Sequence, residues 1–148
     1  MRDQVFVSYS HRDKRWLDRV HVNLRPLERE GKLILWDDSR IRPGQDWRAE
    51  IDRALASAKV AVLLVSADFL ASDFIANDEL PALLAAAESE GAVILSVIVG
   101  PSLFLETPSI SRFQAVNEPS KPLSSLSRAK QEEVLVRLAR SIDEALAR

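Results

Sequence analysis

The sequence predicts an α/β fold in which helices cover both faces of a parallel sheet. Two stretches, KVAVLLVS at residues 59–66 and AVILSVIV at residues 92–99, are apolar on both faces, which is typical of buried parallel strands. Segments with helical periodicity alternate with the strands, and this alternation indicates right-handed βαβ units. At 148 residues the chain has the length of one domain. We expect a single domain over residues 1–148, either as a whole protein or as the N-terminal part of a longer one.

The first strand and the first helix follow directly from the N-terminal residues. Residues 4–8, QVFVS, are rich in β-branched and aromatic types and predict a buried strand. A helix is expected over about residues 13–30, with Gly31 as its C-cap and a kink at Pro26, which lacks the backbone N–H. The buried face of this helix is predicted to contain Leu17, Val20, Leu24 and Leu27.

The middle of the chain repeats the same order. Residues 33–36 predict a short strand, and a charged loop follows at residues 37–46. Asp46 is suited to N-cap a helix over about residues 47–57. The next strand, residues 59–66, is expected at the centre of the sheet because it has no polar face.

The segment after the central strand contains a proline that disturbs its helical pattern. We expect a turn at residues 67–71 and a helix from residue 72 or 73 to Glu90. Pro81 cannot donate a hydrogen bond to the carbonyl of Asn77, so a kink or a restart of the helix is predicted there.

The C-terminal third carries a weaker signal until its last helix. Residues 100–126 are rich in Pro, Ser and Thr, and within them a short edge strand is expected at residues 113–116. An amphipathic helix is predicted over about residues 128–147, because apolar residues recur every four positions.

Composition excludes several classes of function. The formal net charge is −2 without blocks of like charge, which argues against nucleic-acid binding through bulk charge. With no cysteine and two separated histidines, we expect no metal site. No apolar run reaches the roughly 18 residues of a membrane span, and strand 4–8 leaves no space for a signal peptide, so we expect a cytoplasmic protein without membrane contact.

The loop from Trp36 to Trp47, WDDSRIRPGQDW, is the strongest candidate for a site wall. In open parallel α/β sheets, ligands bind outside the carboxyl ends of the strands, where this loop begins. The sequence contains neither of the common glycine-rich phosphate motifs nor a G-x-S-x-G nucleophile elbow. A receiver-like phosphorylation site is also disfavoured, because the central strand ends in Val65-Ser66.

Four motifs in order over about 130 residues resemble a Toll/interleukin-1 receptor (TIR) domain of the bacterial type. They are VFVSYSHRD at 5–13, WDDSRIRPGQDW at 36–47, VAVLLVSADFLASDF at 60–74 and NDEL, which contains Glu79. The resemblance implies a flavodoxin-like three-layer sandwich with five parallel strands. It also implies that the Trp36–Trp47 loop is the family's BB loop, which mediates assembly between TIR domains. The implied interface residues are Asp38, Arg40, Arg42, Pro43 and Gly44.

The enzymatic members of this family cleave NAD+ between nicotinamide and ribose, with NAD+ as the substrate and no further cofactor. Glu79 stands at the position of their catalytic glutamate. One carboxylate suffices in physical terms, because nicotinamide leaves as a neutral base and the transition state is cationic on the ribose. Many of these enzymes have Trp-x-x-x-Glu, whereas this chain has Ile75 four positions before Glu79.

Several further residues are candidates for substrate binding, and each also has a purely structural interpretation. Trp47 or Trp36 could replace the missing ring as a stacking face, or could belong to the core. The turn at Ser10, His11 and Arg12 could receive a phosphate or could be a solvated cap. Asp37 could contact the substrate or, like Asp38, only orient the loop through an Asx turn. The expected substrate-binding set is Ser10, His11, Arg12, Asp37, Trp47 and Ile75.

The leading interpretation is therefore an NAD+ glycohydrolase that is activated by self-association into a homo-oligomer or filament. The resemblance makes bacterial defence against phage, or an NAD-derived signal, the expected role. The alternative is a non-catalytic scaffold that binds other TIR domains or modulates host TIR signalling. A third possibility is a nucleotide sensor that does not cleave its ligand. Hydrolysis, cyclisation and base exchange stay open, because they differ only in the nucleophile that reaches the ribose.

Overall fold

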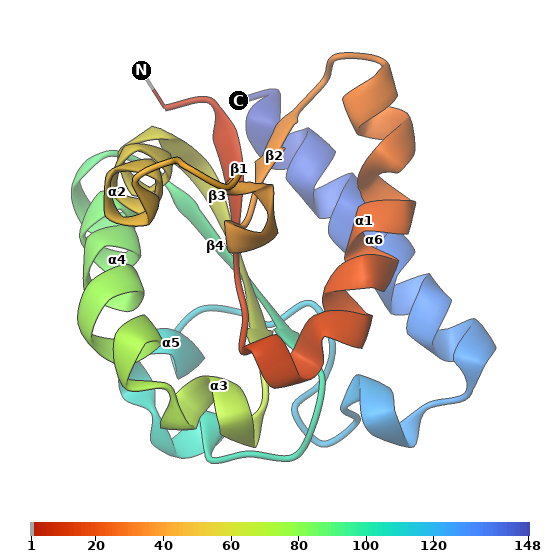
Figure 1. Cartoon of the computed structure of the whole chain (residues 1–148). Helices are drawn as coiled ribbons and strands as arrows, with labels where there is room; N and C mark the ends of the chain where they lie inside the picture. Colours follow the sequence, from red (N-terminus) through yellow and green to blue (C-terminus); the bar gives the residue numbers. More distant parts are fainter. Residues whose placement is uncertain (1) are drawn as a thin grey trace.

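The computed structural model describes residues 2–148, which form a three-layer α/β sandwich (Figure 1). Its sheet contains β1 (Gln4–Ser8), β2 (Ile34–Trp36), β3 (Ala58–Val65) and β4 (Val93–Ile98) in the order β2-β1-β3-β4. All three pairings are parallel, with Val5 opposite Leu35 on one side and Val60 on the other. The predicted α/β class and the four strong strands are confirmed.

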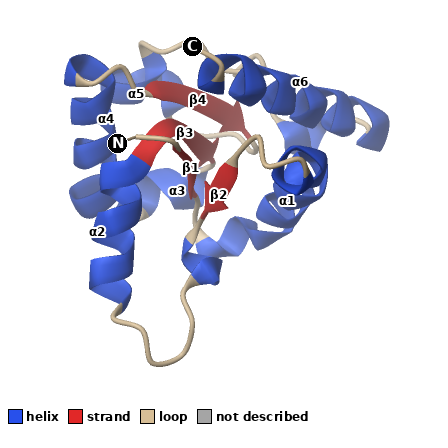
Figure 2. Ribbon diagram, turned by 90° about the horizontal axis from the view of Figure 1, so that it is seen from above, coloured by secondary structure: helices blue, strands red, loops and turns tan. Residues whose placement is uncertain are grey.

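Two apolar cores lie on opposite faces of the sheet, and a separate group of helices covers each face (Figure 2). Helices α1 (Lys14–Arg29) and α6 (Arg128–Leu146) cover one face, where Leu17 and Leu138 pack against the Val5 side of β1. Helices α2 (Trp47–Ser57) and α4 (Leu80–Ser89) cover the other face, together with the short helix α3 (Ala67–Ala71). Within residues 2–148, no helix has both the length and the apolar character needed to cross a membrane.

The predicted C-cap of α1 and the predicted N-cap of α2 are both confirmed by hydrogen bonds from backbone N–H groups. Gly31, at φ 71°, ends α1 in a Schellman motif, in which its N–H donates to Glu28 and the N–H of Lys32 donates to Leu27. Asp46 caps α2 by accepting hydrogen bonds from the N–H groups of Arg48 and Ala49.

The expected fifth strand is wrong, because residues 113–116 form no strand. The chain enters this region through the short helix α5 (Pro108–Ser111) and keeps a single strand-like bond, from the N–H of Val116 to the carbonyl of Ser96. The side-chain amide of Asn117 then accepts from the N–H of Ile98 at 2.8 Å and donates to its carbonyl at 3.0 Å. One buried amide thus satisfies the edge of β4 that a fifth strand would have paired.

The segment between β3 and β4 differs from the single helix expected there. Residues 67–71, predicted as a turn, form α3, which Ser66 caps through a hydrogen bond from the N–H of Phe69. A π-helical turn (Ile75–Glu79) follows and leads directly into α4. Pro81 lies at the start of α4, and the predicted kink or restart takes the form of a change from π to α geometry, because the helical backbone continues through Leu80.

Candidate functional site

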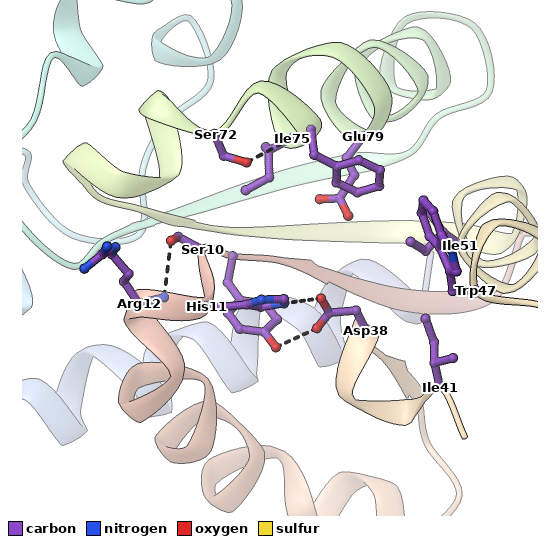
Figure 3. A pocket seen from close by; sticks show the side chains of 12 residues that line it. Ser10, His11, Arg12, Asp38, Ile41, Trp47, Ile51, Ser72, Ile75 and Glu79 are labelled. Atoms are coloured by element: carbon purple, nitrogen blue, oxygen red, sulfur yellow. Dashed lines mark hydrogen bonds and ion pairs between the residues drawn. The ribbon is translucent and has the colours of Figure 1, made fainter. Parts of the chain in front are cut away.

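A cleft of about 570 Å³ opens at the carboxyl ends of β1 and β3 (Figure 3). The connections from these two strands run in opposite directions along the sheet, toward β2 and toward β4. This is the topological switch point at which α/β sheets bind ligands, because the diverging loops leave a crevice between them. The walls come from the turn after β1, the loop after β2, the start of α2 and residues 72–79.

Glu79 lies at the floor of this cleft with its side chain almost entirely buried, at 7% exposure. Its Oε1 accepts a hydrogen bond from the hydroxyl of Ser8 at 2.6 Å. Burial is the main cause that raises the pKa of Glu79 to about 7, and the negative charges of Asp38 and Asp78 also raise it. The hydrogen bond from Ser8 and the charge of His11 lower the pKa in part. The carboxyl group is therefore held near the midpoint of its titration at neutral pH.

The π-helical turn decides which side chains accompany Glu79. In an α-helix a residue five positions earlier would point about 140° away, at 100° per residue. The π turn has more residues per turn, so residues four and five positions before Glu79 both lie on its side. Ile75 and Phe74 accordingly both line the cleft.

An aromatic pair forms one end of the cleft. The rings of Trp47 and Phe74 lie 6.0 Å apart between centroids and are tilted by 60°. Trp47 is 55% exposed, whereas Ile75 is buried. The exposed indole face is available to a flat ring that enters the cleft beside Phe74.

A shared carboxylate forms the wall opposite the π turn. Asp38 accepts a hydrogen bond from the Tyr9 hydroxyl at 2.6 Å and contacts Nε2 of His11 at 2.5 Å (Figure 3). Burial and the Asp38 bond raise the pKa of Tyr9 above its usual range, so its hydroxyl stays a donor. This network joins the loop after β2 to the turn after β1.

The other end of the cleft carries the polar turn after β1. Ser10 caps the short helix at His11–Asp13 by accepting a hydrogen bond from the N–H of Arg12. The side chains of His11 and Arg12 are largely exposed, and the Arg12 guanidinium lies 4.0 Å from Asp68. Hydroxyl and cationic groups are thus presented to any anionic group bound at this end.

The sequence matches the family model described as TIR domain over residues 5–133. The chain belongs to the TIR domain family. The expected family and its flavodoxin-like α/β fold are confirmed, with four strands in place of five.

Two curated relatives share parts of this TIR domain. An uncharacterized protein of Sinorhizobium fredii, y4lF, is 31% identical over 144 residues, which cover 97% of this chain and 44% of the relative. A probable 2′ cyclic ADP-D-ribose synthase of Methanobrevibacter olleyae, TcpO, is 34% identical over 68 residues, or 46% of this chain and 19% of that protein. The chain spans less than half the length of either relative.

The TIR domain brings most of the predicted site residues together. The cleft is lined by Ser10, His11, Arg12, Trp47, Ile75 and Glu79 from the predicted catalytic and substrate-binding sets. Trp36 lies outside it and stacks on Phe6 at 5.2 Å. Among residues 2–148, no three His, Cys, Asp or Glu side chains are grouped closely enough to hold a metal ion.

Asp37 does not line the cleft as expected, whereas Asp38 does. Asp37 is fully buried outside the cleft, where it accepts hydrogen bonds from the backbone N–H and the hydroxyl of Ser39 and contacts Nε2 of His21 at 2.7 Å. It forms the Asx turn that was the structural alternative for it. Asp38, expected at an interface, lines the cleft.

The remaining residues of the expected interface lie on the loop between Asp38 and α2. Arg40 is tied to Glu28 at 3.5 Å and to Asp37 at 4.0 Å. Arg42, Pro43 and Gly44 are exposed at the tip, where the loop projects from the molecule (Figure 2). Gly44 has a φ of 88°, which other residues rarely adopt.

Ser8, Tyr9 and Phe74 are not among the site residues expected from the sequence. Ser8 ends the predicted strand over residues 4–8 and Tyr9 follows it directly, and polar residues at the end of a buried strand are themselves a signal for a site. Phe74 is not expected there because a regular α-helix would point it away from Glu79. Pro81 was the available signal that the helix before it would be irregular.

Proposed function

We propose that this TIR domain cleaves NAD+ at the bond between nicotinamide and ribose, with Glu79 as the catalytic carboxylate. The observation that carries the proposal is the buried Glu79 carboxyl group at the floor of a cleft of about 570 Å³. In NAD+ the positive charge lies on the nicotinamide ring, and in the transition state it moves to the ribose. An anion held beside the ribose in a site of low dielectric therefore stabilises the transition state more than the ground state. Nicotinamide leaves as a neutral base and requires no proton donor.

The two ends of the cleft suit the two kinds of group in a dinucleotide. The aromatic end, Trp47 with Phe74, offers an apolar face to the nicotinamide ring beside Glu79. The polar end, at Ser10 and Arg12, suits the diphosphate. The Methanobrevibacter relative is a probable 2′ cyclic ADP-D-ribose synthase, and this similarity supports chemistry at the same bond of NAD+.

We further propose that self-association through the exposed tip at Arg42–Gly44 activates the domain. The tip lies on the loop whose first residue, Asp38, lines the cleft. Contacts made by a second TIR domain at the tip can therefore change the wall of the site. The same exposed tip supports the second candidate, a scaffold that binds other TIR domains without cleaving NAD+.

The deciding experiment measures nicotinamide release from NAD+ by the purified protein at high concentration with a crowding agent. We expect release by the wild type and a loss of at least about 100-fold in Glu79→Ala, which is the usual scale for removing one stabilising group. Chromatography of the products then distinguishes ADP-ribose from its cyclic forms.

Glu88→Ala is the matched control, because Glu88 is an exposed carboxylate on α4, the helix that follows Glu79. Equal activity in wild type and Glu79→Ala would refute the catalytic role. Absence of cleavage by assembled wild type would favour the scaffold.

The aromatic end of the cleft yields a separate prediction. Trp47→Ala should raise KM for NAD+ about tenfold, because stacking of a base on an aromatic ring contributes about 1–3 kcal/mol. Trp47→Phe should restore most of the affinity, since it keeps a ring against Phe74. Steady-state kinetics on the three proteins measure this, and an unchanged KM in Trp47→Ala would place the substrate ring elsewhere.

A further inference from the structure

Ser8 makes the one side-chain hydrogen bond that Glu79 receives within residues 2–148. The Ser8 hydroxyl donates to Oε1 of Glu79 at 2.6 Å, and both residues are buried. No described residue donates a hydrogen bond to Oε2. The contact therefore distinguishes the two oxygens, with Oε1 held by the protein and Oε2 left for a ligand.

The position of Ser8 in β1 explains how this contact arises. Alternate residues of a strand point to opposite faces, so Ser8 shares the face of Phe6, which packs with α2 and the π turn. Val5 and Val7 belong to the other core. Ser8 is thus a buried hydroxyl at the end of an apolar strand, where an unpaired polar group is costly and Glu79 is its partner.

The charged groups around Glu79 do not fix its orientation. Asp38 and Asp78 repel its charge and His11 attracts it, but none of the three hydrogen-bonds to it. Asp78 is itself engaged by Arg48 at 3.3 Å, and His11 is engaged by Asp38. The rotamer of Glu79 consequently depends on the Ser8 bond and on apolar neighbours.

We propose that Ser8 is a positioning residue that holds Oε1 of Glu79 so that Oε2 faces the cleft. This inference rests on the proposed function for its kinetic consequence, while the contact itself is independent of any substrate. A hydroxyl that donates to a carboxylate also favours the ionised form, which is the form that stabilises a cationic ribose. Ser8 then influences both the orientation and the ionisation of the Glu79 carboxyl group.

The test combines Ser8→Ala and Ser8→Thr with kinetics and a direct titration of Glu79. NMR of ¹³C-labelled glutamate side chains, with the Glu79 signal assigned by its loss in Glu79→Gln, reports the pKa without any substrate. In Ser8→Ala we expect the pKa of Glu79 to rise by about one unit, because one hydrogen bond to the ionised form is lost. The acidic limb of the pH–rate profile should move to higher pH by the same amount. Because a smaller fraction of Glu79 is then ionised, kcat at pH 7 should be about fivefold lower, with KM unchanged. Ser8→Thr keeps the hydroxyl and should restore both values.

Ser96→Ala is the matched control, because Ser96 is a buried strand serine whose hydroxyl has no hydrogen-bond partner among the described residues. The proposal is overturned if the pKa of Glu79 is the same in Ser8→Ala and wild type, or if Ser96→Ala shifts it equally. If wild type releases no nicotinamide, the proposed function fails, and the titration alone still decides whether Ser8 positions Glu79.

Discussion

Glu79→Gln is expected to lose NAD+ cleavage by at least about 100-fold and at the same time to make the protein more stable above neutral pH. The loss of activity follows because the neutral amide cannot balance the positive charge that forms on the ribose. The gain in stability follows because the wild-type protein buries a carboxyl group whose pKa is raised by desolvation from 4.5 to about 7. Function and stability thus make opposite demands on this side chain.

The sign of the stability effect follows from where the proton is held. Below pH 4.5 Glu79 is protonated in the folded and unfolded states alike, so its ionisation costs nothing. Between pH 4.5 and about 7 the unfolded chain releases the proton first, and the free energy of unfolding decreases as the pH rises. Above about pH 7 Glu79 is ionised in both states, and its burial then lowers the free energy of unfolding by about 3 kcal/mol, since one pKa unit corresponds to about 1.4 kcal/mol.

Urea denaturation of wild type and Glu79→Gln at pH 5 and pH 8 measures the effect. We expect a difference of about 3 kcal/mol at pH 8 and less than about 1 kcal/mol at pH 5. Glu88→Gln should show no such pH-dependent difference, because Glu88 is exposed. A Glu79→Gln protein that is no more stable than wild type at pH 8 would mean that the carboxyl group is hydrated in solution.

The strong elements could be predicted because their local signals agree with their tertiary environment. Strand β3 is apolar on both faces and lies at the centre of the sheet between β1 and β4. Gly31 and Asp46 mark helix ends through backbone geometry that few other residues provide. The absence of a fifth strand beside β4 could not be predicted, because the side-chain amide of Asn117 makes the hydrogen bonds that such a strand would make to Ile98.

The composition of the site was predictable only as far as it depends on strand ends. The residues directly after β1 and β3 must meet at the switch point, which predicts that the turn at Ser10 lines a site, whereas Glu79 was expected there from the resemblance to TIR domains. Phe74 could not be, since it reaches the cleft through a π turn that no residue spacing encodes. The sequence also could not show which of Asp37 and Asp38 lines the cleft. The backbone conformation at the end of β2 decides which of the two carboxylates is buried and which faces the cleft.

Asp37→Ala is expected to lower the free energy of unfolding by about 3 kcal/mol or more, which is the scale for removing one partner of a buried ionic network. The Asp37 side chain is fully buried and satisfies three polar groups, the backbone N–H and hydroxyl of Ser39 and Nε2 of His21. Alanine leaves all three without their acceptor and leaves a cavity beneath the loop. Asp37→Asn keeps one oxygen acceptor and should cost less.

Asp73→Ala provides the control, because Asp73 is an exposed carboxylate for which the described residues provide no hydrogen bond or ion pair. It should change stability by less than about 0.5 kcal/mol. Since Asp37 also fixes the backbone from which Asp38 reaches the cleft, we expect Asp37→Asn to weaken NAD+ cleavage even where the protein remains folded. If Asp37→Ala were as stable as wild type, His21 and Ser39 would have found other partners. The loop after β2 would then be held from the cleft side, through the contacts of Tyr9 and His11 with Asp38.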